Sequence, residues 1–125
     1  MKSCLPHLMF EVPLEDVFDL WRSAVPDLQV NAIAMDNDVL TLAHATICGQ
    51  TFSVFRSPIG HDFEFTPSFS LMITCASAAE VDQMAGALSE GATILMPIDR
   101  YDFAERFTWI NDRFGMSWQF MWNGA

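Results

Sequence analysis

Hydrophobic and polar positions in the first half of the chain predict a strand, a helix and three further strands. Apolar residues recur at helical spacing over 14–24, after a strand-like segment at 5–12. Pro13 suits the first turn of that helix, and Pro26 marks its end. The further strands are expected at 28–35, 39–47 and 51–56, separated by turns at 36–38 and 48–50.

The same order of elements begins again after a loop at about 57–68. A strand is expected at 70–75, and a helix from Ser77, a plausible N-cap with Glu80 three residues on, to about Leu88. A short apolar segment and a hairpin are expected at 92–96, 106–111 and 116–122.

The two halves align with each other. Residues 7–12 match 70–75 at a shift of 63, and residues 48–55 match 114–121 at a shift of 66. The pattern therefore predicts an α+β protein made of a duplicated βαβββ unit. We expect one domain over 1–125, with module 1 at about 5–56, a linker at about 57–68 and module 2 at about 69–122.

Alternation along the strands gives each half one apolar face, suited to its helix, and one mixed face. The mixed faces carry His7, Met9, Glu11, Ser53, Phe55, Ser70, Met72, Gln119 and Met121. A mixed face of this kind is typical of a small-molecule cavity. The alternative is that a loop or another subunit covers it.

Composition narrows the classes of partner. The chain is 51% hydrophobic and has 6 basic against 16 acidic residues, a formal net charge of −10. Nucleic acid and anionic membrane surfaces are therefore not expected as partners. No apolar run reaches the length of a membrane span.

Three cysteines outside any C-x-x-C pair, and an N-terminus without a signal-peptide core, predict a cytoplasmic protein with reduced thiols.

Three segments carry a family resemblance: MPIDRYDFAERFTWINDRFGMSWQFMW at 96–122, GHDFEFTPSFSLMITCASAAEVDQMAGALSEGA at 60–92 and, more loosely, 5–27. Together they resemble PhnB-like proteins, also described as the 3-demethylubiquinone-9 3-methyltransferase domain, in the vicinal oxygen chelate superfamily of glyoxalase and bleomycin-resistance proteins. Asp102 stands where the family usually has Pro, and only a local loop change is expected there.

The resemblance implies two βαβββ modules that form a curved mixed sheet around a cavity, and a homodimer. Metal-dependent members of the superfamily carry ligands on the first and last strand of each module. Those positions fall on His7, Ser53, Ser70 and Gln119 in this chain. The internal repeat pairs the same positions, His7 with Ser70 and Ser53 with Gln119.

Of these four side chains only His7 is a good ligand for a divalent transition metal, and catalytic sites of that type need about three. Glu11 stands about 13 Å along the strand from His7, too far to share an ion. His44 and His61 lie outside the mapped positions. We therefore expect no metal or other cofactor, with His7 the one weak candidate ligand.

Other catalytic motifs are absent from the sequence. There is no G-x-G, so the glycine-rich nucleotide loops are missing, and no G-x-S-x-G or H-E-x-x-H occurs. Charged residues gather around the last hairpin, where ion pairs or loop bracing are expected, with an anion-recognising arginine as the alternative: Asp99, Arg100, Arg106, Asp112 and Arg113.

Three functions fit this sequence. The first is a small-molecule-binding protein that needs no metal and orients its ligand with His7, Ser53, Ser70 and Gln119. The second is a metal-dependent lyase, isomerase or dioxygenase of the superfamily, in which the ion polarises a substrate oxygen. The third is a structural or regulatory dimer whose cavity is filled by its own side chains.

Overall fold

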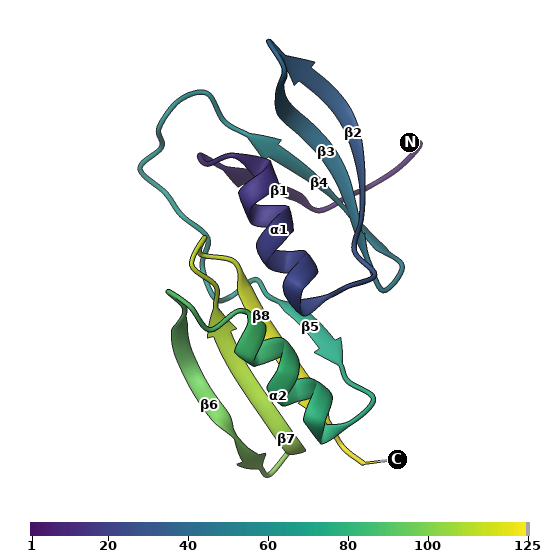
Figure 1. The fold of residues 1–125 in the computed structure, drawn as a ribbon, viewed down its shortest axis with the longest axis vertical. Helices are drawn as coiled ribbons and strands as arrows, with labels where there is room; N and C mark the ends of the chain where they lie inside the picture. Colours follow the sequence, from purple (N-terminus) through teal and green to yellow (C-terminus); the bar gives the residue numbers. More distant parts are fainter. Residues whose placement is uncertain (125) are drawn as a thin grey trace. The chain divides into compact units, whose positions relative to one another are not determined.

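The computed structural model describes residues 1–124. They form two units, Met1–Asp62 and a second from Phe63 onward. The division falls inside the expected linker. Each unit has one helix packed on one face of a four-stranded sheet (Figure 1).

Unit 1 contains β1 (His7–Phe10), α1 (Leu14–Ala24), β2 (Gln29–Asp36), β3 (Val39–Ile47) and β4 (Gln50–Arg56). The order across its sheet is β1-β4-β3-β2. β1 runs parallel to β4, and the other neighbours are antiparallel. The helix connects β1 to the β2–β3–β4 meander and covers one face of the sheet (Figure 1).

The core of unit 1 lies between α1 and that face. The helix buries Leu14, Val17 and Trp21, and the sheet contributes Phe52 and Val54 from β4. Aromatic edges fill the remaining space, since the Trp21 ring meets Phe10 at 5.8 Å and Phe18 at 6.0 Å between centroids. The face turned away from α1 keeps the polar and mixed residues of each strand.

Unit 2 contains β5 (Leu71–Thr74), α2 (Ala78–Ala87), β6 (Thr93–Tyr101), β7 (Ala104–Asn111) and β8 (Ser117–Trp122). Its sheet order is β5-β8-β7-β6, with β5 parallel to β8. This is the order of unit 1 repeated, so the predicted α+β fold of two βαβββ modules is confirmed.

The β6–β7 hairpin is longer than expected. β6 extends to Tyr101 rather than ending near residue 96, and β7 starts at Ala104. Three shifts of register interrupt the β6–β7 pairing, which hides the strand from a period-two pattern. Asp102, where the family usually has Pro, lies in the turn of this hairpin.

The predicted capping box of α2 is confirmed. Ser77 Oγ accepts a hydrogen bond from the Glu80 backbone N–H at 3.0 Å. Glu80 Oε1 in turn accepts one from the Ala76 N–H at 3.1 Å.

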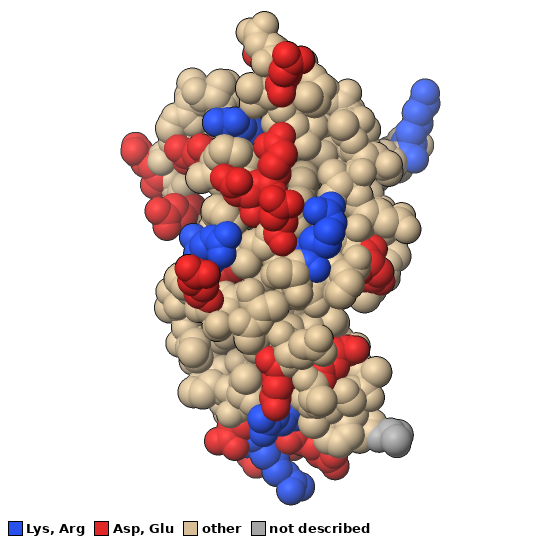
Figure 2. Space-filling model, viewed as in Figure 1, with Lys and Arg blue, Asp and Glu red and all other residues tan. Residues whose placement is uncertain are grey.

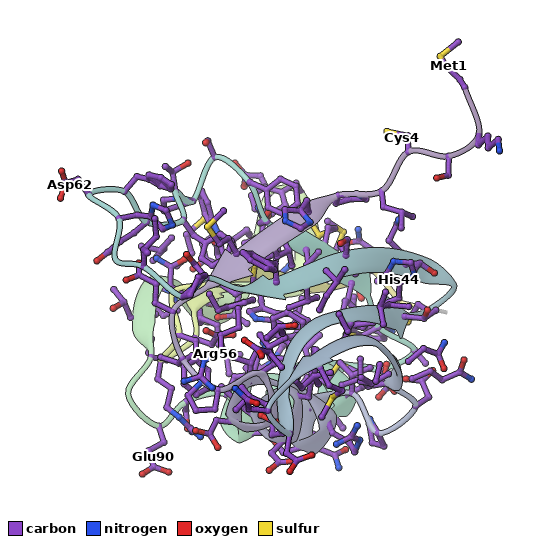
Figure 3. The ribbon with its side chains drawn as sticks, turned by 90° about the horizontal axis from the view of Figure 1, so that it is seen from above. Met1, Cys4, His44, Arg56, Asp62 and Glu90 are labelled. Carbon is purple, nitrogen blue, oxygen red and sulfur yellow. The ribbon has the colours of Figure 1, made fainter. Side chains whose placement is uncertain are left out.

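None of the helices in residues 1–124 is long and apolar enough to cross a membrane. Among the described residues the three cysteines form no disulfide with one another, and Cys4 and Cys48 are exposed while Cys75 is buried. Cys4 lies on an N-terminal segment that extends away from the strands (Figure 3).

Candidate functional site

The face of the unit 1 sheet opposite α1 is organised in rows that cross the strands. One row aligns His7 of β1, Ser53 of β4 and His44 of β3 as direct neighbours. The next row toward the end of β1 aligns Met9, Phe55 and Leu42. We call these the histidine row and the apolar row.

His7 and Ser53 are joined by a hydrogen bond. His7 Nδ1 lies 2.9 Å from Ser53 Oγ, and the tautomer of the imidazole decides which atom donates. The His7 ring also stacks on Phe55, with 6.0 Å between centroids and 26° between planes. Two of the sequence-predicted site residues therefore form one hydrogen-bonded pair beside an aromatic side chain.

His44 completes the histidine row, although it lies outside the positions predicted from the resemblance. It is half-buried on the same face as Ser53. Among residues 1–124 its imidazole has no hydrogen-bond or ring partner. The sequence contained a signal for it, because antiparallel pairing across the 48–49 turn places residue 44 opposite Ser53.

Unit 2 repeats the polar pair. Gln119 Nε2 donates to Ser70 Oγ at 2.9 Å, linking β8 to the residue just before β5. Met72 and Met121 lie on the same face, Met72 directly beside Gln119 and 49% exposed. Trp109 of β7 is the other neighbour of Gln119 and donates from Nε1 to Ser117 Oγ at 2.7 Å.

The four positions carried over from the resemblance are thus joined two by two. His7 pairs with Ser53 in unit 1 and Ser70 pairs with Gln119 in unit 2. The bond in unit 1 connects β1 to β4, and the bond in unit 2 connects the residue just before β5 to β8. The internal symmetry predicted from the sequence shifts is therefore present in the hydrogen bonding.

Glu11 lies apart from these pairs. β1 ends at Phe10, so Glu11 is in the bend that follows and does not continue the His7–Met9 alternation. It lines a separate hollow of about 400 Å³ within unit 1, with Asp36, Asn37, Val39, Thr41, Arg56, Ser57 and Pro58. Ser57 is buried there and lies 2.8 Å from His61 Nε2.

The donor set in the two pairs does not fit a catalytic transition-metal site. Of the four paired side chains only the His7 imidazole is a strong ligand for such an ion, and it is engaged with Ser53. Across residues 1–124 no three His, Cys, Asp or Glu side chains gather in a way that could hold a metal. No chemical step through a metal is derived from these residues.

The charged residues near the last hairpin brace the fold. Arg106 donates from Nε and from a terminal nitrogen to the two Asp82 oxygens, each at 2.8 Å, tying β7 to α2. These hydrogen bonds raise the pKa of Arg106 above its usual range. Asp112 is buried and accepts hydrogen bonds from the Phe114 and Met116 backbone N–H groups and from Trp118 Nε1. Arg106 therefore forms an ion pair and Asp112 braces the loop, the first of the two expectations for this group, as far as these two residues are concerned.

The repeated unit and its paired polar positions can be compared with known proteins. The family model described as 3-demethylubiquinone-9 3-methyltransferase matches residues 2–121. The chain belongs to this PhnB-like family. Among curated proteins no sequence matches significantly.

Solved structures agree with this membership. The chain is similar to a PhnB protein from Bacillus cereus at 31% identity and a TM-score of 0.87, covering 97% of this chain and 99% of that one. A glyoxalase/bleomycin resistance protein from Albidiferax ferrireducens matches at 15% identity and a TM-score of 0.64, covering 98% and 100%. A glyoxylase/bleomycin resistance protein/dioxygenase domain from Frankia matches at 15% and 0.68, covering 100% and 93%.

The last two likenesses show the fold and nothing finer, because their identities are low. This PhnB-like chain therefore has the glyoxalase fold, as the sequence resemblance predicted.

Proposed function

We propose that this PhnB-like protein binds a small molecule without a metal. The site lies on the sheet faces opposite the helices, which carry the paired positions. The observation that carries the proposal is the repeated hydrogen bond, His7 to Ser53 and Gln119 to Ser70. Each pair lies among Met and Phe side chains that are only partly covered. A few oriented polar groups in apolar surroundings are the usual composition of a small-molecule site.

His7, Ser53, Ser70 and Gln119 would orient the ligand by hydrogen bonds in this proposal. Met9, Phe55, Met72 and Met121 would supply the apolar contacts. The alternative, a metal-dependent lyase, isomerase or dioxygenase, needs ligands that the two pairs do not contain.

We also propose that the protein acts as a homodimer in the cytoplasm. The dimer is implied by the family resemblance, and β2 and β6 leave apolar side chains exposed at sheet edges, among them Ile33, Met35, Ile94 and Ile98. The three free cysteines fit a reducing compartment.

A ligand screen on metal-stripped protein tests the proposal. The uniformly ¹⁵N-labelled chain is screened against small molecules in the presence of EDTA, and amide shifts are followed by NMR. We expect saturable binding that moves amides of β1 and β4 or of β5 and β8. We expect Ser53→Ala or Gln119→Leu to weaken the affinity of a small molecule bound in the same unit by about tenfold. That loss corresponds to one to two hydrogen bonds.

The matched control is Thr41→Val, which changes a hydroxyl in β3 that instead bonds the Ala34 carbonyl. Binding or turnover that appears only after a divalent ion is added, and disappears in His7→Ala, would overturn the proposal. It would support the metal-dependent alternative.

A further inference from the structure

On the face of the unit 1 sheet opposite α1, polarity changes from one row of side chains to the next. Thr46 and Thr51 form a row of neutral hydroxyls, with their oxygens 2.9 Å apart. The histidine row of His7, Ser53 and His44 comes next, and the apolar row of Met9, Phe55 and Leu42 follows. Rows on one face of a strand are two residues apart, about 7 Å, so one small molecule can span two of them.

Formal charge is missing from three of the four strands on this face. The positions of β1, β3 and β4 that the register pairs there are His7, Met9, Leu42, His44, Thr46, Thr51, Ser53 and Phe55, and none is Asp, Glu, Lys or Arg. The chain nevertheless has 16 acidic residues. Figure 2, seen from the α1 side, shows acidic side chains gathered over that opposite surface, where α1 itself carries Glu15, Asp16 and Asp19.

The histidine row has unused hydrogen-bonding capacity. His7 uses Nδ1 on Ser53, which leaves its Nε2 for another partner. Both ring nitrogens of His44 are without a partner among residues 1–124. Figure 3 labels His44, which the register places on the face turned away from α1. Imidazole donates N–H in both charge states and adds a positive charge when it is protonated.

We propose that the histidine row binds the anionic oxygens of an amphiphilic ligand, an organic carboxylate whose apolar body lies on the apolar row. This inference rests on the proposed small-molecule function and names the chemical class of its ligand. His44 and His7 donate to the carboxylate, and the Ser53 hydroxyl lies between them. Met9, Phe55 and Leu42 contact the hydrocarbon part. No carboxylate is among the β1, β3 and β4 positions of this face, so none of these side chains repels the anion.

Two probes of equal shape test the inference. Benzoate and benzamide differ in charge but share the ring, and both are titrated into the full chain while amide shifts are measured. We expect benzoate to move the amides around His44, Ser53 and Phe55 and to bind at least about fivefold more tightly than benzamide, because hydrogen bonds to charged acceptors are the stronger ones.

A variant then assigns the preference to His44. His44→Phe keeps a flat ring and removes both nitrogens. We expect this variant to lower the affinity for benzoate to that for benzamide, and to change the affinity for benzamide by less than twofold. The matched control is His61→Phe, which removes the same side chain from the 57–70 loop and is expected to change neither probe.

Equal binding of the two probes would overturn the anionic ligand and leave the proposed small-molecule function standing. An unchanged benzoate affinity in His44→Phe would overturn the role of His44. If neither probe moves amides of β1, β3 or β4, the carboxylate site is overturned, and the ligand screen decides the proposed function independently.

Discussion

Asp112 fixes the turn between β7 and β8. Its Oδ1 accepts from the Phe114 and Met116 backbone N–H groups at 2.9 and 3.1 Å, and its Oδ2 accepts from Trp118 Nε1 at 2.9 Å. Trp118 is fully buried and directly precedes Gln119. A carboxylate at this position therefore sets both the turn and the orientation of the strand that carries a site residue.

Replacing Asp112 measures that role. We expect Asp112→Ala to destabilise the protein by about 3 kcal/mol or more, because three hydrogen-bond donors, two of them buried, lose their acceptor. Asp112→Asn keeps an oxygen for the backbone groups and loses the Trp118 bond, so about 1.5 kcal/mol is expected. Urea unfolding followed by tryptophan fluorescence gives both values. Equal losses in the two variants would contradict the assignment of the bonds.

The sequence predicts some residues of the candidate site and not others. His7, Ser53, Ser70 and Gln119 were predicted from a resemblance and an internal repeat, and the structure joins them in pairs. His44 was missed because it is not at a position that the family uses for ligands. Strand alternation together with the 48–49 turn is enough to place it beside Ser53.

At the level of elements, two glycines of unit 2 differ in whether an alanine could replace them. Gly86 lies inside α2, where an added Cβ would meet no atom within 4 Å. Gly91 has a φ of +72°, and a Cβ there would lie 2.9 Å from Arg113 Cβ. One glycine is thus replaceable, and the other is required by the backbone and by the approach of the β7–β8 turn.

The two alanine variants form a matched pair. We expect Gly86→Ala to stabilise the protein by about 0.5 kcal/mol, because alanine lowers the entropy of the unfolded chain. Gly91→Ala is expected to cost about 2 kcal/mol through its positive φ and the contact with Arg113. Calorimetric melting temperatures should move in opposite directions, and a fall in both would contradict the account of Gly86.

Elements with a regular pattern were predictable, and the irregular one was not. The helices and the β2–β3–β4 meander lie within a residue or two of their expected bounds. The sequence predicts only the first part of β6, because its register shifts and Pro97 remove the alternation that identifies a strand. β1 is shorter than expected, which takes Glu11 out of the strand alternation that His7 and Met9 share.

For the whole molecule, the proposed homodimer is the feature that can be tested with least ambiguity. Ile94 on the edge strand β6 is 62% exposed, and Ile59 in the loop after β4 is 64% exposed. We expect the full chain to sediment as a dimer and Ile94→Asp to shift it toward monomer. Ile59→Asp adds the same charge at an equally exposed apolar residue outside the sheets, and it should leave the dimer intact. A monomeric wild-type chain would contradict the proposal.

The parallel pairings have a consequence for folding kinetics. His7 and Ser53 are 46 residues apart, and Ser70 and Gln119 are 49 apart, whereas the hairpins between them close over short turns. Closing the longer loops costs more chain entropy, so the β1–β4 and β5–β8 contacts form after the hairpins. Both polar pairs belong to these late contacts. We expect a ligand held by them to lengthen the lifetime of the folded state with little effect on the folding rate, because contacts made late in folding change mainly the unfolding rate.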